Sequence, residues 1–195
     1  MPVDPSVERT ATLFTPLPII WGFCGGWALD LFLNRTTRPH KDVDIAILRG
    51  DQRAVFDFLR QRGWTLEQAV DGKLLPLHKD EFLLLPIHTI WCRNAQARPD
   101  FLEVLLNESE GNQFLFRRDP SIRHPLNEAF MLSPSGFPIL APEIALLYKA
   151  GHPQRAENAL DFQSMLPELN IQRRQWLRAA LNQLYPEHEW LKVLR

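Results

Sequence analysis

The segment 41–48, Lys-Asp-Val-Asp-Ile-Ala-Ile-Leu, constrains the fold more than any other part of this chain. Apolar and polar residues alternate along it, so that Val43 and Ile45 point to one side of an extended chain. Asp42 and Asp44 point to the other side. The period of two predicts a strand that buries its apolar face and carries both carboxylates together on the opposite face.

A glycine-opened helix is predicted just before that strand. The residues 26–34 follow the pair Gly25-Gly26, and Trp27 and Leu31 lie one helical turn apart. The surrounding apolar stretch 18–33 is too short for a membrane span of about 20 apolar residues, and it contains an aspartate and three glycines. We therefore expect a buried segment and no membrane partner.

The remaining pattern predicts an α+β fold, with a small mixed sheet flanked by helices and a C-terminal helical bundle. A helix is expected at 51–62, ended by Gly63, followed by strands at 88–93, 101–107 and 113–118 with a hairpin loop at 108–112. After a proline-rich stretch, helices are expected from Pro142, at 155–166 and at 172–184. The character of the chain changes at residue 141, which predicts two parts, 1–140 and 141–195.

The charge balance excludes some classes of function. The 195 residues include 22 basic and 23 acidic side chains, a formal net charge of -1, so no positive field attracts a nucleic-acid backbone. The two cysteines, Cys24 and Cys92, form no CxxC pattern, which argues against a disulfide framework or a zinc knot. No signal peptide is recognisable at the N-terminus, and we expect a cytoplasmic protein. The sequence makes no prediction of oligomeric state.

Three carboxylates form a candidate metal site. Asp42 and Asp44 lie at i and i+2 on one strand, and Glu103 lies on a later strand. Oxygen ligands of this kind suit Mg²⁺, and paired metals stabilise the attacking and leaving oxygens of a phosphoryl displacement. Gly25 and Gly26 would let phosphates approach the backbone N–H groups at a helix start. Each feature alone is common on ordinary surfaces and turns, but their order along the chain favours one phosphoryl-transfer site.

The segments 25–30 (Gly-Gly-Trp-Ala-Leu-Asp) and 38–44 (Arg-Pro-His-Lys-Asp-Val-Asp) resemble antibiotic nucleotidyltransferases of the aminoglycoside 2''-adenylyltransferase and lincosamide type, within the polymerase-beta-like superfamily. The resemblance covers residues 20–50, with weaker support from 99–166. It implies that 1–140 is a nucleotidyltransferase domain. It also implies an enzyme that uses Mg²⁺ to move a nucleoside monophosphate from an NTP, with ATP expected, to a hydroxyl of a small molecule, releasing pyrophosphate.

The resemblance also implies roles for particular residues. Asp42, Asp44 and Glu103 would be the catalytic and metal-binding residues, with Glu103 acting either as a base or as a metal ligand. Gly25 and Gly26 would bind the nucleotide phosphates.

Two cations are further candidates for nucleotide binding. Lys149 resembles a phosphate-binding lysine of the family's helical part, although a solvated helix lysine explains it equally well. Arg38 could reach a phosphate or could pair with Asp30. We expect Asp161, in the same helical part, to lie on a helix surface.

Other enzyme classes fit less well. The glycines do not follow the GxGxxG spacing, no P-loop Gly-Lys-Ser/Thr occurs, and the six histidines form no zinc motif. Cys24 is more typical of a buried thiol than of a nucleophile.

A second class of function is a non-catalytic nucleotide-binding protein, or a toxin–antitoxin partner, on the same fold. The retained aspartates favour the enzyme. The acceptor could be aminoglycoside-like or lincosamide-like, and a cleft lined by Trp91, Glu108 and Glu110 would suit a cationic sugar.

Overall fold

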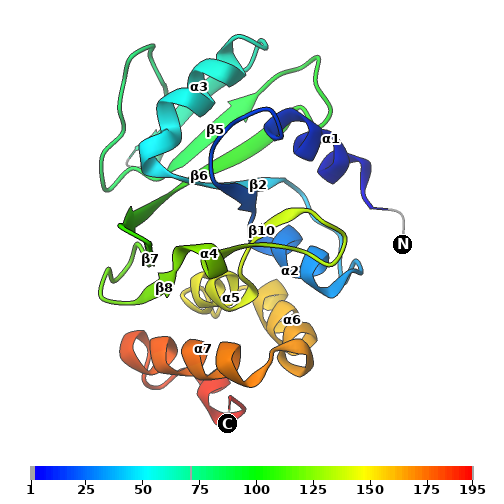
Figure 1. Cartoon of the computed structure of the whole chain (residues 1–195), viewed down its shortest axis with the longest axis vertical. Coiled ribbons are helices and arrows are strands. Elements are labelled where there is room, and N and C mark those ends of the chain that lie inside the picture. The colour runs from blue at the N-terminus through cyan, green and yellow to red at the C-terminus, as the bar shows by residue number, and fades with distance from the viewer. Residues whose placement is uncertain (1–2, 71, 195) are drawn as a thin grey trace.

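The computed structural model describes residues 3–70 and 72–194, and it confirms the expected α+β fold. Figure 1 shows the sheet and α3 at one end of the molecule, α6 and α7 with the C-terminus at the other end, and α2 and α5 between them. The helices are α1 Pro5–Phe14, α2 Gly25–Leu33, α3 Gln52–Arg60, α4 Leu126–Ala129, α5 Pro142–Ala150, α6 Ala156–Met165 and α7 Ile171–Leu184. Short 3₁₀ turns occupy Arg49–Asp51, Leu166–Glu168 and Glu189–Lys192.

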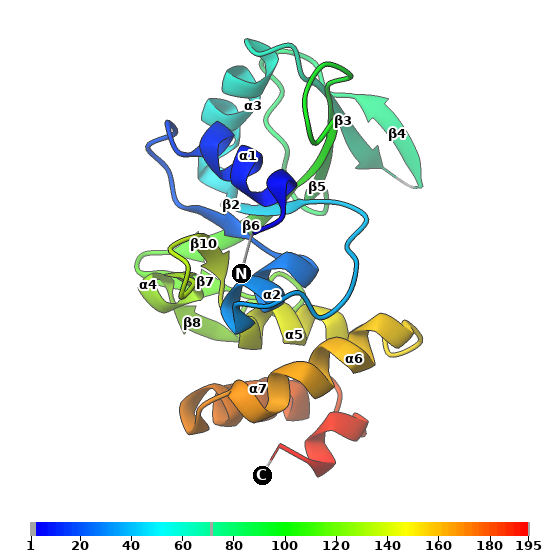
Figure 2. The ribbon, with the colours of Figure 1, turned by 90° about the vertical axis from the view of Figure 1, so that its right-hand side faces the viewer.

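The strands form a mixed sheet in the order β4-β3-β5-β6-β2-β1-β10-β9, with β7 and β8 continuing from β6. Their bounds are β1 Trp21–Phe23, β2 Asp44–Leu48, β3 Thr65–Val70, β4 Lys73–Pro76, β5 Thr89–Arg93, β6 Phe101–Glu110, β7 Gln113–Leu115, β8 Arg123–Pro125, β9 Phe130–Leu132 and β10 Pro138–Leu140. β2 runs parallel to β6 and antiparallel to β1, and β1 runs parallel to β10. Figure 2 shows β3 and β4 projecting as a hairpin at one edge.

The strand predicted at 41–48 is shorter than expected. It begins at Asp44, and Asp42 lies in the bend that leads into it. The Asp42 carbonyl accepts a hydrogen bond from the indole nitrogen of Trp27 at 3.1 Å, so this peptide is bonded to α2 rather than to a strand. The prediction that both aspartates lie on one strand is therefore wrong, whereas the alternation from Asp44 onward is confirmed.

Other elements differ from the sequence expectations in their bounds. α1, β1 and the hairpin of β3 and β4 were not predicted. The expected loop at 108–112 is a tight turn, because β6 continues to Glu110 and pairs with Gln113 across Gly111, whose φ is +55°. The helices predicted at 26–34, 51–62, 155–166 and 172–184 are present with ends shifted by one or two residues.

One close backbone contact joins the early and late parts of the chain. β1 pairs with β10 at Phe23 and Ile139, and a Cβ added to Gly22 would lie 2.8 Å from the carbonyl carbon of Ile139. Only glycine fits this approach without moving β10. Because Pro142 begins α5 directly after β10, the contact also sets the position of that helix.

The helices after residue 141 pack as a group against α2. α5 contacts α2, α6 and α7, and its buried face includes Ile144 and Leu147. Glu143 is also buried, 1% exposed, and its carboxylate bonds to Arg173 of α7 and to His124 of β8.

The division of the chain at residue 141 stays a prediction. Within the described residues, no helix is long and apolar enough to cross a membrane.

Candidate active site

Strand pairing brings the three predicted carboxylates together. Asp44 begins β2, and Glu103 lies opposite it on the parallel strand β6. Directly paired residues point to the same face of a sheet, so the two side chains lie side by side. Asp42 reaches them from the bend before β2, and one carboxylate oxygen from each residue lies within 4.8 Å of the other two.

The electrostatics of this cluster favour a bound cation. Burial, followed by the charges of Glu103 and Asp42, raises the pKa of Asp44 to about 8, with Lys149 acting in the opposite direction. Burial and Asp42 also raise the pKa of Glu103. The Oδ1 atom of Asp44 is buried and has no hydrogen-bond partner among the described residues. A divalent cation would satisfy that oxygen and offset the repulsion, so the donor set fits Mg²⁺.

The start of α2 is shaped to lie against this cluster. Gly25 has a φ of +60°, and a Cβ there would overlap Oδ2 of Asp44. A Cβ on Gly26 would lie 2.5 Å from the ring of His40 and 2.7 Å from the guanidinium of Arg38. The two glycines therefore allow the carboxylate and two basic side chains to approach the N–H groups at the helix start.

A buried aspartate holds both predicted cations. Arg38 donates to Asp161 from Nε at 2.8 Å and from a terminal nitrogen at 2.9 Å, and Lys149 Nζ lies 2.8 Å from the same carboxylate. Asp161 is 2% exposed, so the expectation that it lies on a helix surface is wrong. Burial alone would raise its pKa, but Arg38 and Lys149 outweigh that effect and lower it. Lys149 is thus an ion-paired residue of the site and not a solvated lysine.

The alternative pairing of Arg38 with Asp30 is wrong. The Asp30 carboxylate instead accepts a hydrogen bond from the Thr37 hydroxyl at 2.6 Å and bonds to His40 Nε2 at 2.6 Å. The His40 ring in turn packs 4.2 Å from Trp27, centroid to centroid. This cluster fixes the loop between α2 and β2, and it leaves Arg38 free to turn toward Asp161.

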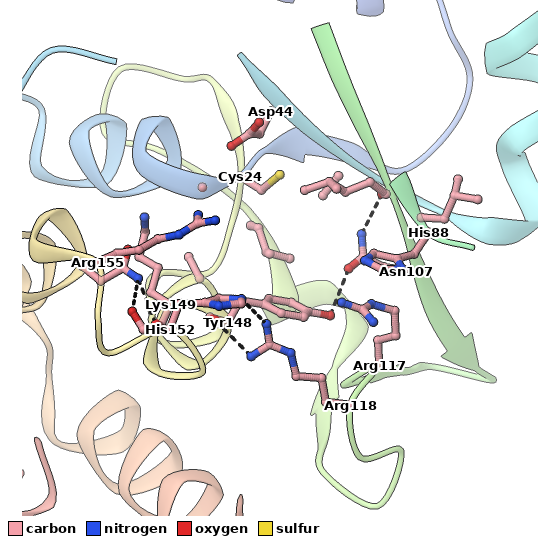
Figure 3. Close-up of a pocket in the computed structure, with 17 residues that line it drawn as sticks. Cys24, Asp44, His88, Asn107, Arg117, Arg118, Tyr148, Lys149, His152 and Arg155 are labelled. Carbon is pink, nitrogen blue, oxygen red and sulfur yellow. Dashed lines mark hydrogen bonds between the residues drawn. The ribbon is translucent and has the colours of Figure 1, made fainter. Parts of the chain in front are cut away.

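A cavity of about 580 Å³ contains all seven predicted site residues in its lining. They are Gly25, Gly26, Arg38, Asp42, Asp44, Glu103 and Lys149. A second cavity of about 290 Å³ shares part of this lining and extends to Arg117 and Arg118, as Figure 3 shows. Arg155 and Asn158 line both cavities. They were not predicted, because they lie near the start of α6 with no motif around them.

The cleft expected from Trp91, Glu108 and Glu110 is not formed by these three residues. Trp91 is paired with Glu103 and lies beside the site, but Glu108 bonds to Arg49 at 2.6 Å and Glu110 to Arg123 at 2.8 Å. Both acids lie at the far end of β6. Cys24 is buried, and burial raises the pKa of its thiol well above the ordinary value, which disfavours a nucleophile.

The sequence of this chain is similar to those of known antibiotic-modifying and antibiotic-resistance proteins. The model of the family described as aminoglycoside-2''-adenylyltransferase matches residues 7–164. A lincosamide resistance protein of Staphylococcus haemolyticus is 25% identical over 111 residues, which are 55% of this chain and 63% of that protein. The match therefore spans less than two thirds of the length of this curated relative.

Several solved structures share the fold. That of the antibiotic-resistance factor ANT(2'')-Ia has a TM-score of 0.61 at 13% identity, covering 97% of this chain and 96% of that one. The lincosamide antibiotic adenylyltransferase LnuA, bound to lincomycin, has a TM-score of 0.59 at 15% identity, covering 84% and 96%. ANT(2'')-Ia in complex with adenylyl-2''-tobramycin has a TM-score of 0.53 at 12% identity, covering 96% and 91%.

Proposed function

Since this chain belongs to the aminoglycoside-2''-adenylyltransferase family, a family of nucleotidyltransferases, we propose that it transfers a nucleoside monophosphate from an NTP to a hydroxyl of a small molecule and releases pyrophosphate. We propose ATP as the nucleotide and the cytoplasm as the location. One observation carries the proposal: Asp42, Asp44 and Glu103 offer oxygens within 4.8 Å of one another, beside the glycine-opened start of α2.

Asp42, Asp44 and Glu103 are the residues that would hold Mg²⁺. The buried, unpartnered Oδ1 of Asp44 supports this assignment. When bound, the metal supplies positive charge at the reacting phosphate and orients it for in-line attack.

The other residues of the larger cavity would bind and orient the nucleotide. Because Gly25 and Gly26 have no side chains, Asp44 and Arg38 lie directly against the start of α2, so a phosphate bound to the N–H groups there would lie beside the carboxylates and a cation. Lys149 and Arg38 present positive charge to the same cavity while Asp161 fixes their positions. A fixed cation stabilises charge that develops in the transition state without the cost of reorganising.

We propose that Glu103 acts either as a third ligand to the metal or as the base that takes the proton of the acceptor hydroxyl. In the metal-free protein, burial and Asp42 raise the pKa of its carboxyl, which favours proton uptake. Glu103 lies opposite Trp91 of the neighbouring strand β5 and lines the same cavity as Lys149.

The acceptor class is proposed from the relatives. One similar structure holds lincomycin and another holds adenylyl-2''-tobramycin, so we propose an acceptor of the lincosamide or aminoglycoside type. The test is a pyrophosphate-release assay with each of the four NTPs, Mg²⁺, and lincomycin or tobramycin as acceptor. Release that depends on both the acceptor and Asp44 supports the proposal.

A matched control sharpens this assay. Asp57→Asn changes an exposed aspartate of α3, whose ion pair with Arg60 is long, 3.6 Å, and it should leave turnover unchanged. If magnesium-ATP binds but no acceptor yields pyrophosphate, the alternative of a non-catalytic nucleotide-binding protein on this fold replaces the enzyme.

A further inference from the structure

The smaller cavity extends from the carboxylate cluster to a group of arginines. It has a volume of about 290 Å³ and is bounded by β6, α5, the turn after β7 and the connection between α5 and α6. Figure 3 shows Asp44 at one side, Lys149 and Arg155 at one end, and Arg117 and Arg118 at the other. We call this space the arginine cavity.

The charge in the arginine cavity is strongly one-sided. Its lining contains four cationic residues, Arg117, Arg118, Lys149 and Arg155, and Asp44 is the sole acid among the lining residues that the structure describes. Lys149 is already paired with Asp161, which lies outside the lining. The other three cations have no ion pair among residues 3–70 and 72–194.

Arg117 is the most informative of these cations. Its side chain is half-buried, and no described residue accepts a hydrogen bond from its guanidinium. Burial lowers its pKa, and the positive charges of Arg118 and Arg49 lower it further, against the opposing effects of Tyr148 and Glu108. Glu108 is itself paired with Arg49, and no carboxylate of the described residues forms an ion pair with Arg117. An anion in the cavity would offset the cost of holding this charge partly out of water.

Arg118 is held in place by neutral groups. It donates to the Tyr148 carbonyl at 3.1 Å and to the Tyr185 hydroxyl at 3.3 Å, and it lies 3.0 Å from Nε2 of His152. These contacts fix the side chain but leave its charge uncompensated. Burial and the charges of Arg118 and Arg155 lower the pKa of His152, which favours the neutral ring beside the cation.

We propose that the arginine cavity binds an anionic group of the phosphate class beside the carboxylates, with Arg117 and Arg118 as its main ligands. Guanidinium groups bind phosphate oxygens through paired N–H donors, which suits two neighbouring arginines on one turn. The anion has two possible sources, the pyrophosphate end of the NTP or a phosphate substituent on the acceptor. The first source rests on the proposed function, but anion binding itself does not require any transfer reaction.

Calorimetric titration of three probes into the full chain tests this inference. The probes are pyrophosphate in EDTA, magnesium-ATP, and glucose 6-phosphate as a simple phosphate monoester. Arg117→Gln removes the charge, Arg117→Lys keeps it, and Arg178→Gln is a matched control on the exposed face of α7. Thermal melting shows that each variant is folded, and the change to Gln is expected to preserve stability because it relieves repulsion from Arg118.

We expect Arg117→Gln to weaken pyrophosphate binding about tenfold or more, which is the effect of losing a charge-assisted hydrogen bond. Arg117→Lys should recover part of this affinity, and Arg178→Gln should bind pyrophosphate as the wild type does. Parallel loss of magnesium-ATP affinity assigns the anion to the nucleotide. Unchanged pyrophosphate and ATP affinity with weaker glucose 6-phosphate binding assigns it to the acceptor. Equal binding of all three probes by wild type and Arg117→Gln overturns the inference, whether or not nucleotidyl transfer has been detected.

Discussion

Two carboxylates in this chain, Asp44 and Glu143, are both desolvated, but their neighbours shift their pKa values in opposite directions. Glu143 in α5 bonds to Arg173 and His124, and these contacts outweigh burial and lower its pKa. Asp44 on β2 faces two further carboxylates, its pKa is raised to about 8, and its Oδ1 has no partner among the described residues.

The difference separates a structural acid from an acid kept for a ligand. If one partner of a buried ion pair is removed, the other is left as an uncompensated buried charge. Removing the Glu143 carboxylate should therefore destabilise the folded protein. An acid surrounded by like charges lowers stability until a cation arrives. Proteins depart from local consistency of this kind mainly at functional sites.

The largest expected effect is on turnover in Asp44→Asn. Removing a ligand to a metal that stabilises transition-state charge should cost several kcal/mol, or about a thousandfold or more in turnover. The same change removes repulsion among the carboxylates, so the metal-free protein should melt at the wild-type temperature or above it. Pyrophosphate release and thermal melting, with Asp57→Asn beside them, measure both. A folded Asp44→Asn protein with wild-type turnover would remove the basis for the metal assignment.

Glu143→Ala should show the reverse pattern. It leaves Arg173 and His124 without their carboxylate in a buried position, which should lower the free energy of unfolding by about 3 kcal/mol. Urea denaturation measures the loss. Glu168→Ala, at an exposed position, serves as the control and should change stability by less than about 0.5 kcal/mol. Equal stability of the two variants would show that the buried contacts of Glu143 are not stabilising.

Magnesium should stabilise the wild-type protein and not Asp44→Asn. A ligand present at a hundred times its dissociation constant adds about 2.7 kcal/mol, which for a domain of this size raises the melting temperature by roughly 5–10 °C. Thermal melts in EDTA and in a magnesium series give the shift. The same shift in both proteins would place the bound ion elsewhere.

The smallest effect concerns acid pH. The pKa of Glu143 lies below its ordinary value of 4.5, so its contribution to stability is complete above that value and is lost as the pH falls through the folded-state pKa. Glu143→Gln should therefore flatten the decline in stability between about pH 5 and pH 3. Urea midpoints across this range measure the slope. An unchanged slope would mean that other acids dominate acid unfolding.

The local patterns in the sequence were enough to predict that the carboxylates of the candidate site lie together. Alternation from Asp44 gave the strand, and the glycine pair gave the start of α2. Asp42 was placed wrongly because a hydrogen bond from Trp27, fifteen residues away, holds it in a bend. Local periodicity carries no information about such a contact.

Contacts between distant residues explain most of what was missed. Arg38 and Asp161 are 123 residues apart, and their ion pair follows from the packing of α6 beside α2, which no local pattern encodes. β3 buries the polar Gln68 where alternation would place an apolar residue, and every residue of β4 is exposed, so neither strand shows the usual pattern in the sequence. α1 does carry a start signal, Asp4 before Pro5, but its polar and β-branched residues weaken the helical pattern.

The contact between Gly22 and Ile139 has a consequence for how the protein is made. β1 leaves the ribosome early, but its parallel neighbour β10 follows on the order of ten seconds later at ordinary rates of synthesis. By the end of that interval all three carboxylates have been synthesised, whereas one edge of β1 still has no partner. A chain that stops before residue 138 would leave β1, the neighbour of the strand that begins at Asp44, as an open sheet edge, the kind of edge that pairs with other chains. β1 is therefore covered only after Ile139 has been synthesised and β10 has paired with it, which removes the edge at which nascent chains would aggregate.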